Sequence, residues 1–190
     1  NQGDKEVLLT DYSGLLNWQG YLYVLKPDSN KRFTQFQDRI PIGPKALSGG
    51  AKGAIASANI NSDDYPEIIV PASFGIYVYG LNSTGQLEKL WNNSEAFIYH
   101  TAVVADVDAD NEYEIIYTTT DDISFCPGGV TCTKRLHIAT ALNGSEECFA
   151  NLPEIPFSDP AVGNLNSDNK LEIAIVTRAS SGSGSSTGNI

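Results

Sequence analysis

The chain has 190 residues, and its 41% hydrophobic content is enough for a substantial core in one large or two small domains. Twelve Lys and Arg residues stand against 23 Asp and Glu residues, which gives a formal net charge of −11. This balance argues against nucleic-acid binding, which needs a basic surface, and it favours cation binding where carboxylates cluster. No stretch approaches the roughly 20 apolar residues of a membrane helix, so we expect no membrane span in this segment.

Short β-branched and aromatic runs, bounded by turn residues, recur along the whole chain. Because no such run has helical periodicity, the sequence predicts an all-β protein. In chain order we expect strands at residues 20–25, 32–36, 54–56, 68–70, 75–79, 86–91, 102–104, 115–117, 135–139, 147–150, 161–163 and 173–176.

Three nine-residue segments, 59–67, 106–114 and 164–172, superpose without gaps, and residues 3–9 match the back half of a fourth copy. Each full copy lies between a small apolar strand and a β-branched one. The glutamates that anchor the copies, Glu6, Glu67, Glu114 and Glu172, are 61, 47 and 58 residues apart. The shortest interval has the length of a four-stranded propeller blade. The longer ones contain insertions, at 13–20 or 41–52 and at 121–134.

The nine-residue segments have the chemistry of a calcium loop. Side-chain oxygens at positions 1, 3 and 5, a backbone carbonyl at 7 and an acidic side chain at 9 form the hard oxygen cage that Ca²⁺ prefers. One loop offers Asp106, Asp108, Asp110 and Glu114; the other two offer Asn59, Asn61, Asp63 and Glu67, and Asn164, Asn166, Asp168 and Glu172. Because affinity rises with ligand charge, we expect the tightest site in loop 106–114. In the two Asn-led loops, hydrogen bonds from the amides could hold the loop without metal.

Position 6 of the loop, occupied by Asp64, Asn111 and Asn169, must turn sharply, often with positive φ, which Asn and Asp tolerate. An EF-hand is excluded, because that motif needs Gly at position 6, Glu at position 12 and flanking helices.

The run of residues 104–116 resembles the FG-GAP repeat, also called the VCBS or integrin-α-like repeat. The resemblance covers nearly the whole chain and implies a β-propeller, usually of about seven blades, with calcium in loops at the blade edges. It also implies carbonyl ligands at Glu112, Tyr65 and Lys170. Two departures from the family motif are Asn at positions 1 and 3 in two loops and the lack of Gly at position 6.

The propeller material amounts to about three blades of four antiparallel strands over residues 1–179, too few to close a ring. Residues 180–190 are expected to be a Ser/Gly-rich loop or the start of another blade. We therefore expect the chain to be part of a longer polypeptide and of a larger ring.

Cysteines and glycosylation sequons predict an oxidising, extracellular or cell-surface location. Cys126 and Cys132 can close a disulfide over a Pro-Gly turn, which leaves Cys148 as a free thiol. Asn82, Asn92 and Asn143 begin Asn-x-Ser/Thr sequons in turn-like stretches.

No catalytic motif stands out. Residues 184–188 match Gly-x-Ser-x-Gly only inside a low-complexity tail, and the Gly-rich segment 43–53 lacks phosphate-loop spacing. His100 and His137 are interpreted as packed or cross-strand residues, and Trp18 and Trp91 as blade-to-blade packing.

The favoured function is a non-catalytic calcium-binding propeller that serves adhesion, recognition of a protein or glycan ligand, or surface assembly. The alternatives are the propeller of a secreted polysaccharide lyase or hydrolase, and a self-assembling subunit of a surface filament.

Overall fold

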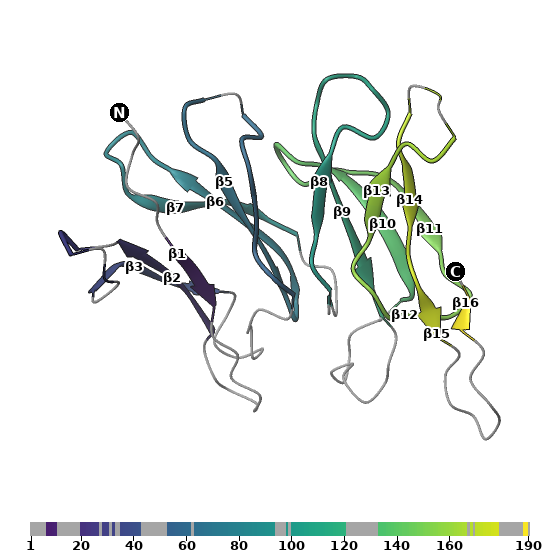
Figure 1. Ribbon diagram of the computed structural model, residues 1–190, viewed down its shortest axis with the longest axis horizontal. Coiled ribbons are helices and arrows are strands. Elements are labelled where there is room, and N and C mark those ends of the chain that lie inside the picture. Colours follow the sequence, from purple (N-terminus) through teal and green to yellow (C-terminus); the bar gives the residue numbers. More distant parts are fainter. Residues whose placement is uncertain are drawn as a thin grey trace. The chain divides into compact units, whose positions relative to one another are not determined.

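A computed structural model describes residues 7–10, 20–26, 28–30, 32, 35–42, 53–61, 63–93, 98, 100–120, 133–166, 168, 170–178 and 188–189. All the regular structure in these residues is β, arranged in antiparallel sheets, which confirms the all-β prediction (Figure 1). The chain divides into two compact units, Asn1–Ala51 and Lys52–Ile190.

The first unit contains one antiparallel sheet in the order β1-β2-β3, formed by Val7–Thr10, Gly20–Lys26 and Gln35–Ile42. The strand expected at 32–36 therefore begins later and ends at Ile42, inside the second of the two candidate insertions, 41–52. The reason is the turn before it. The Asp28 carboxylate accepts hydrogen bonds from the N–H groups of Asn30 and Arg32, at 2.8 and 2.9 Å, so Arg32 belongs to the turn.

The second unit contains two four-stranded sheets, each a meander in chain order. The first is β4-β5-β6-β7, formed by Ala56–Ala58, Glu67–Ala72, Gly75–Leu81 and Leu87–Asn92. The second is β8-β9-β10-β11, formed by Val103–Ala105, Glu114–Thr119, Arg135–Thr140 and Glu146–Asn151. Nearly all the predicted strands of this region are present, with shifts of one or two residues at their ends.

The remaining strands form two smaller sheets. Ala161–Gly163 (β13) pairs with Glu172–Ala174 (β14), and Ile155–Pro156 (β12), Thr177–Arg178 (β15) and Gly188–Asn189 (β16) form a sheet in the order β12-β15-β16. The strand expected at 173–176 thus ends at Ala174, and the next strand, which begins at Thr177, belongs to another sheet. The break occurs where the Val176 N–H leaves the strand ladder and donates to Ser158 Oγ at 2.9 Å.

The three predicted copies have the same strand register. In each, the glutamate at loop position 9 is the first residue of a strand and lies opposite the last residue of the preceding strand. The pairs are Ala58–Glu67, Ala105–Glu114 and Gly163–Glu172. The nine-residue loop therefore connects the first two strands of each copy, which confirms the repeat at the level of hydrogen-bonded register.

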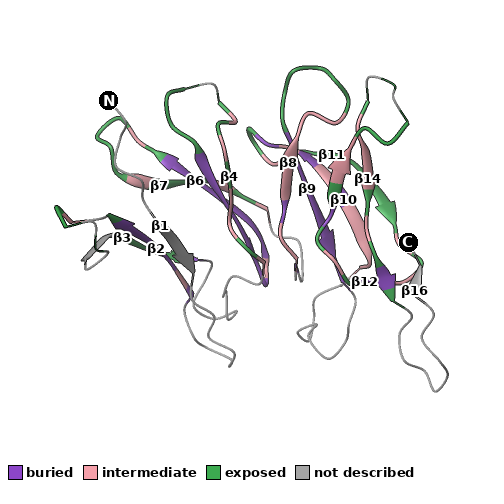
Figure 2. Cartoon of the chain, viewed as in Figure 1, coloured by how far each residue is buried: buried purple, intermediate pink, exposed green. Residues whose placement is uncertain are grey.

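The core of the second unit lies where the two four-stranded sheets pack together. Every residue of β5 and of β9 is buried, so neither strand alternates between buried and exposed positions (Figure 2). One cluster joins the two sheets: Ile69, Ile76, Val78, Ile98, Ala102, Ile115, Tyr117, Ala139 and Ala141.

Trp91 on β7 confirms the prediction that a strand aromatic packs between sheets. Its indole N–H donates to the Ala141 carbonyl of the neighbouring sheet at 3.0 Å. The ring lies against Gly144, where an added Cβ would stand 2.5 Å from Trp91 Cζ3. Nearby, Asn93 Nδ2 donates to the Tyr117 hydroxyl at 2.8 Å.

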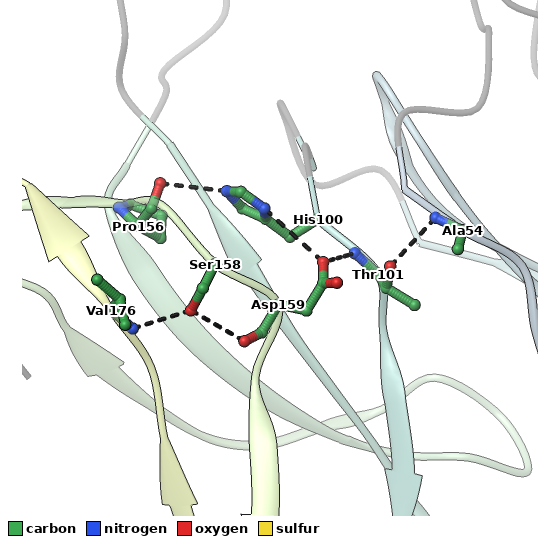
Figure 3. Close-up of polar contacts among 7 residues, drawn as sticks. All are labelled: Ala54, His100, Thr101, Pro156, Ser158, Asp159 and Val176. Carbon is green, nitrogen blue, oxygen red and sulfur yellow. Dashed lines mark hydrogen bonds and ion pairs between the residues drawn. The ribbon is translucent and has the colours of Figure 1, made fainter.

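A second set of contacts joins the sheets at the start of their first strands (Figure 3). Ala54 N–H donates to Thr101 Oγ1 at 3.1 Å, and Thr101 N–H donates to Asp159 Oδ1 at 2.7 Å. Each of these residues is 13 positions before the anchor glutamate of its copy, so the same contact is made twice in succession. His100 packs beside this ladder, with Nε2 3.2 Å from the Pro156 carbonyl and Nδ1 3.8 Å from Asp159 Oδ1, as expected of a packed histidine.

Substitution of two matched glycines measures how much the sheet contact contributes to stability. Gly144 and Gly85 have nearly equal positive φ values, 74° and 75°, but nothing lies within 4 Å of a Cβ at Gly85. Alanine at either site costs about 1 kcal/mol of backbone strain. We expect Gly144→Ala to cost a further 1–3 kcal/mol, roughly, because the methyl group displaces the Trp91 ring. Urea unfolding of both variants checks this, and equal losses would contradict the packing of Trp91 on Gly144.

Candidate metal centre

All three loops are closed by the same hydrogen bond. The backbone N–H of loop position 2 donates to Oε2 of the glutamate at position 9, at 2.9 Å in loop 59–67, 2.8 Å in loop 106–114 and 2.7 Å in loop 164–172. Glu67 and Glu114 are 1% exposed, so a carboxylate enters the interior at the base of these two loops. A buried carboxylate must be paired, hydrogen-bonded or protonated, and the loops meet this demand in two ways.

In the Asn-led loops, side-chain amides supply the hydrogen bonds that the glutamate carboxylate needs. Asn61 Nδ2 donates to Glu67 Oε1 at 2.8 Å, and Asn61 Oδ1 accepts the Asp63 N–H at 2.9 Å. The amide of Asn59 donates to the Asp63 carbonyl.

Loop 164–172 repeats the arrangement residue for residue. Asn166 Nδ2 donates to Glu172 Oε1 at 2.6 Å, and Asn164 donates to the Asp168 carbonyl. These loops are therefore closed by their own hydrogen bonds. Both amides would have to turn their oxygens inward, and lose these bonds, to bind a cation.

In loop 106–114, the corresponding side chains are carboxylates, which cannot donate. Oxygens of Asp106, Asp108 and Glu114 lie within 4.8 Å of one another, the only such group of metal-ligating side chains within the described ranges. Asp106 also accepts N–H bonds from Asp110 and Asn111, at 3.2 and 3.0 Å, which holds its carboxylate inside the loop. Three converging carboxylates are a set of hard oxygen ligands that could hold a metal ion.

The structure does not bring every predicted ligand into this group. The Asp110 carboxylate instead accepts the Glu112 N–H at 2.7 Å, as Asp63 and Asp168 accept the N–H groups of Tyr65 and Lys170. Position 5 is thus a turn-forming residue in all three loops.

Loop 106–114 also has unusual backbone geometry. Of the described non-glycine residues, only Ala109 and Asn111 have positive φ, at 66° and 72°. The prediction for position 6 is confirmed at Asn111, whereas Asp64 at the same position has no positive φ. Of the two positive-φ positions, only position 6 is described in both loops, and there Asn111 and Asp64 differ in backbone conformation.

The electrostatics of Glu114 show the cost of this arrangement. Burial, followed by the nearby charges of Glu147, Asp108 and Asp110, raises the pKa of Glu114 to about 7, although the Val107 N–H bond acts in the opposite direction. A cation at the cluster would compensate the same charges.

Glu147 was not identified from the sequence, because it lies on β11, outside the nine-residue motif. Thr140 lies directly opposite Glu114 in the strand ladder, and its hydroxyl donates to Glu147 Oε1 at 2.8 Å. Glu147 is the extra residue of a β-bulge opposite Ile138 and Ala139. The bulge turns this carboxylate toward the loop and adds a charge that the motif does not contain.

The neighbouring sheet has the same bulge with different residues. There the extra residue is Leu90, opposite Val78 and Tyr79. A Cβ on Gly80 would stand 2.9 Å from Leu90 Cδ1 and 3.4 Å from Glu67 Oε1. An apolar side chain thus covers Glu67 at the place where a carboxylate faces Glu114. Only the register of the sheets could have revealed this difference.

His137 on β10 is buried, as expected of a packed residue. Its ring stacks on Tyr117 with centroids 4.8 Å apart, Nε2 lies 3.1 Å from Thr119 Oγ1, and Nδ1 lies 2.5 Å from Glu146 Oε1. The order carboxylate, imidazole, hydroxyl is that of a nucleophilic triad. However, the Thr119 hydroxyl donates to the Thr133 carbonyl and the residue is 1% exposed, so the network is structural.

The remaining predicted residues are distributed as follows. Cys148 is a free, exposed thiol, and desolvation and the Glu147 and Glu146 carboxylates raise its pKa. Asn82 and Asn143 lie in turns, whereas Asn92 ends β7.

The predictions for Glu6, Trp18, Cys126, Cys132 and Asn169 fall outside the described residues. In the part of the chain that the structure describes, no helix is long and apolar enough to cross a membrane.

No protein-family model matches the chain, and no curated protein matches its sequence.

The metal-free protein should lose stability as the pH rises from about 4.5 to 7. Between these pH values Glu114 is protonated in the folded protein but ionised in the unfolded chain, where its pKa is the ordinary 4.5. Unfolding therefore releases a proton and becomes more favourable as the pH rises. Each pKa unit corresponds to about 1.4 kcal/mol. Urea unfolding in chelator at several pH values measures the loss. The variant Glu114→Gln is the control, and an identical pH profile for both proteins would contradict the raised pKa.

Glu147→Gln should weaken calcium binding by several-fold, because it removes one nearby negative charge and leaves the loop unchanged. Isothermal titration with Ca²⁺ measures the dissociation constant. Glu88→Gln, an exposed glutamate on β7 of the neighbouring sheet, controls for the change in net charge. If the two variants bind calcium equally well, the Glu147 charge does not act on the site.

Proposed function

We propose that the chain is a calcium-binding segment of an extracellular β-propeller, and that its activity is recognition or assembly rather than catalysis. The observation that carries this proposal is the difference between the loops. In two copies of the repeat, amide hydrogen bonds close the loop. In the third copy the loop places the carboxylates of Asp106, Asp108 and Glu114 together.

The propeller assignment is supported by the packing of the second unit. Two four-stranded antiparallel meanders share their register, their β-bulge and their loop position. They pack face to face through buried second strands and through repeated contacts at the start of each first strand. Sheets stacked in this way, each contacting the next through equivalent positions of the repeat, are the elements of a propeller.

Calcium would act here as a structural ion. Asp106, Asp108 and Glu114 would hold it, and it would neutralise a cluster that otherwise repels itself at the junction of β8 and β9. A bound ion would fix this loop in the way that the amides fix the Asn-led loops. Extracellular calcium is abundant enough to fill sites of modest affinity, which agrees with the proposed location. Rigid blades of this kind present loops to a protein or glycan ligand.

The rise in Tm on adding calcium should depend on whether loop positions 1 and 3 carry Asp or Asn. The double substitution Asp106→Asn and Asp108→Asn copies the Asn-led loops, so the variant should fold and remain stable in chelator. The unmodified protein should gain a few degrees in Tm with 1 mM Ca²⁺, and the variant should gain almost none, since an ion that binds only the folded state stabilises it. Differential scanning calorimetry with Ca²⁺ or EGTA measures both.

The reciprocal exchange, Asn59→Asp with Asn61→Asp, is the matched control. It removes the amide donors from Glu67 and should lower Tm in EGTA and create a new calcium response. Magnesium at the same concentration tests the choice of ion. An unmodified protein whose Tm is the same in EGTA and in calcium would refute the structural ion.

A further inference from the structure

A groove lies beside the first Asn-led loop. Its volume is about 560 Å³, within the range of pockets that hold small ligands. One wall is formed by Asp63, Asp64 and Tyr65, and the other by Leu81, Asn82 and Ser83 from the end of β6 and the turn after it. Two large apolar side chains open into solvent here, Tyr65 at 56% and Leu81 at 39% exposure. The groove therefore presents the apolar side chains of Tyr65 and Leu81 beside the carboxylates of Asp63 and Asp64.

The wall of the groove contains a sequon, which begins at Asn82. The side chain of Asn82 is held by the turn: Oδ1 accepts the N–H groups of Thr84 and Gln86 at 3.0 Å each and the Thr84 hydroxyl at 2.7 Å. The nitrogen Nδ2 has only a long contact of 3.5 Å with Glu88 Oε2. The turn thus fixes the amide through its oxygen and leaves the nitrogen available.

The other two sequons are placed differently. Asn92 is the last residue of a strand, and its Nδ2 donates to the Asn93 carbonyl at 3.3 Å. Asn143 lies in a turn, where its Oδ1 accepts the Ser145 N–H at 2.8 Å. Neither lines this groove.

We propose that Asn82 carries an N-linked glycan and that the first N-acetylglucosamine of this glycan occupies the groove against Tyr65 and Leu81. In the modification, Asn82 Nδ2 forms a bond to C1 of the sugar. The bond from C1 to the pyrophosphate of a lipid-linked oligosaccharide donor breaks, the lipid pyrophosphate leaves, and one amide proton is released. The step involves no change of oxidation state.

The chemistry of the groove suits this sugar. The apolar face of an N-acetylglucosamine ring packs on an aromatic side chain, and its hydroxyls donate to carboxylates such as that of Asp64. The backbone at Tyr65 is already placed, because its N–H is bound to Asp63 Oδ1 at 2.7 Å and the loop is closed by its own amides. Little ordering is therefore needed when the sugar binds. The proposal shares with the proposed function only the extracellular location.

The first test is occupancy. The full chain is secreted from a eukaryotic host, digested, and the glycopeptides are identified by mass spectrometry. We expect the Asn82 peptide to carry glycan. An unmodified Asn82 peptide, whether or not Asn92 and Asn143 are modified, overturns the proposal.

The second test is the contact with the groove. In a background with Ser94→Ala and Ser145→Ala, which removes the other sequons, the secreted protein is trimmed to one N-acetylglucosamine and compared with unmodified protein from a bacterial host. The sugar should raise Tm by about 2–4 °C. Tyr65→Ala should abolish the rise, whereas Leu165→Ala, an exposed apolar residue on the other Asn-led loop, should preserve it. A rise that persists with Tyr65→Ala overturns the groove contact.

The two proposals fail independently. The calcium response of the Asp106→Asn, Asp108→Asn variant is measured on bacterial protein without glycan, so a missing glycan leaves it unchanged. Mass spectrometry of the Asn82 peptide does not depend on calcium, so a protein that shows no calcium response can still carry the glycan.

Discussion

The fold of the second unit depends on a carboxylate placed where water hardly reaches. Each repeat begins its second strand with a glutamate that accepts a backbone N–H from the loop, and two of the three, Glu67 and Glu114, are almost completely buried. The bond closes the loop and fixes the register of the first two strands. The second carboxylate oxygen still needs a partner, and the choice of that partner distinguishes one repeat from another.

The partner differs because the chemistry of one atom differs. An amide at position 3 presents N–H to Glu67 or Glu172, so the loop is self-contained. A carboxylate at the same position presents only oxygen, so Asp108 and Glu114 repel each other until a proton or a cation intervenes. The surroundings of the two buried glutamates also differ. Leu90 covers Glu67, whereas Glu147 adds a further charge near Glu114.

Much of the fold was predictable because its signals are local. The repeat of Asn and Asp at alternate positions, the glutamate at position 9 and the β-branched runs all lie within a few residues of one another, and the strands are found where these patterns place them. The positive φ at Asn111 also follows from residue type.

What the sequence did not reveal depends on the register between strands and on side-chain hydrogen bonds within turns. Glu147 is near Glu114 only because β10 lies between them and β11 has a bulge. The later start of β3 depends on a side-chain turn at Asp28, which propensity alone does not rank above a strand. The hydrogen bond from the Glu112 N–H to the Asp110 carboxylate likewise depends on how the turn folds.

The ladder of Ala54, Thr101 and Asp159 joins a backbone donor in one sheet to a side-chain acceptor in the next. Any residue except proline supplies the donor, so only one side chain per repeat is constrained by this contact. A tandem duplication of the gene segment would therefore carry this sheet-to-sheet contact with it, and the contact itself would leave the other side chains of the repeat free to change. Because donor and acceptor are not interchangeable, the contact has a direction along the chain. Repeats that exchange places must keep the donor in the earlier sheet and the acceptor in the later one. The array is therefore modular, and it also has a direction.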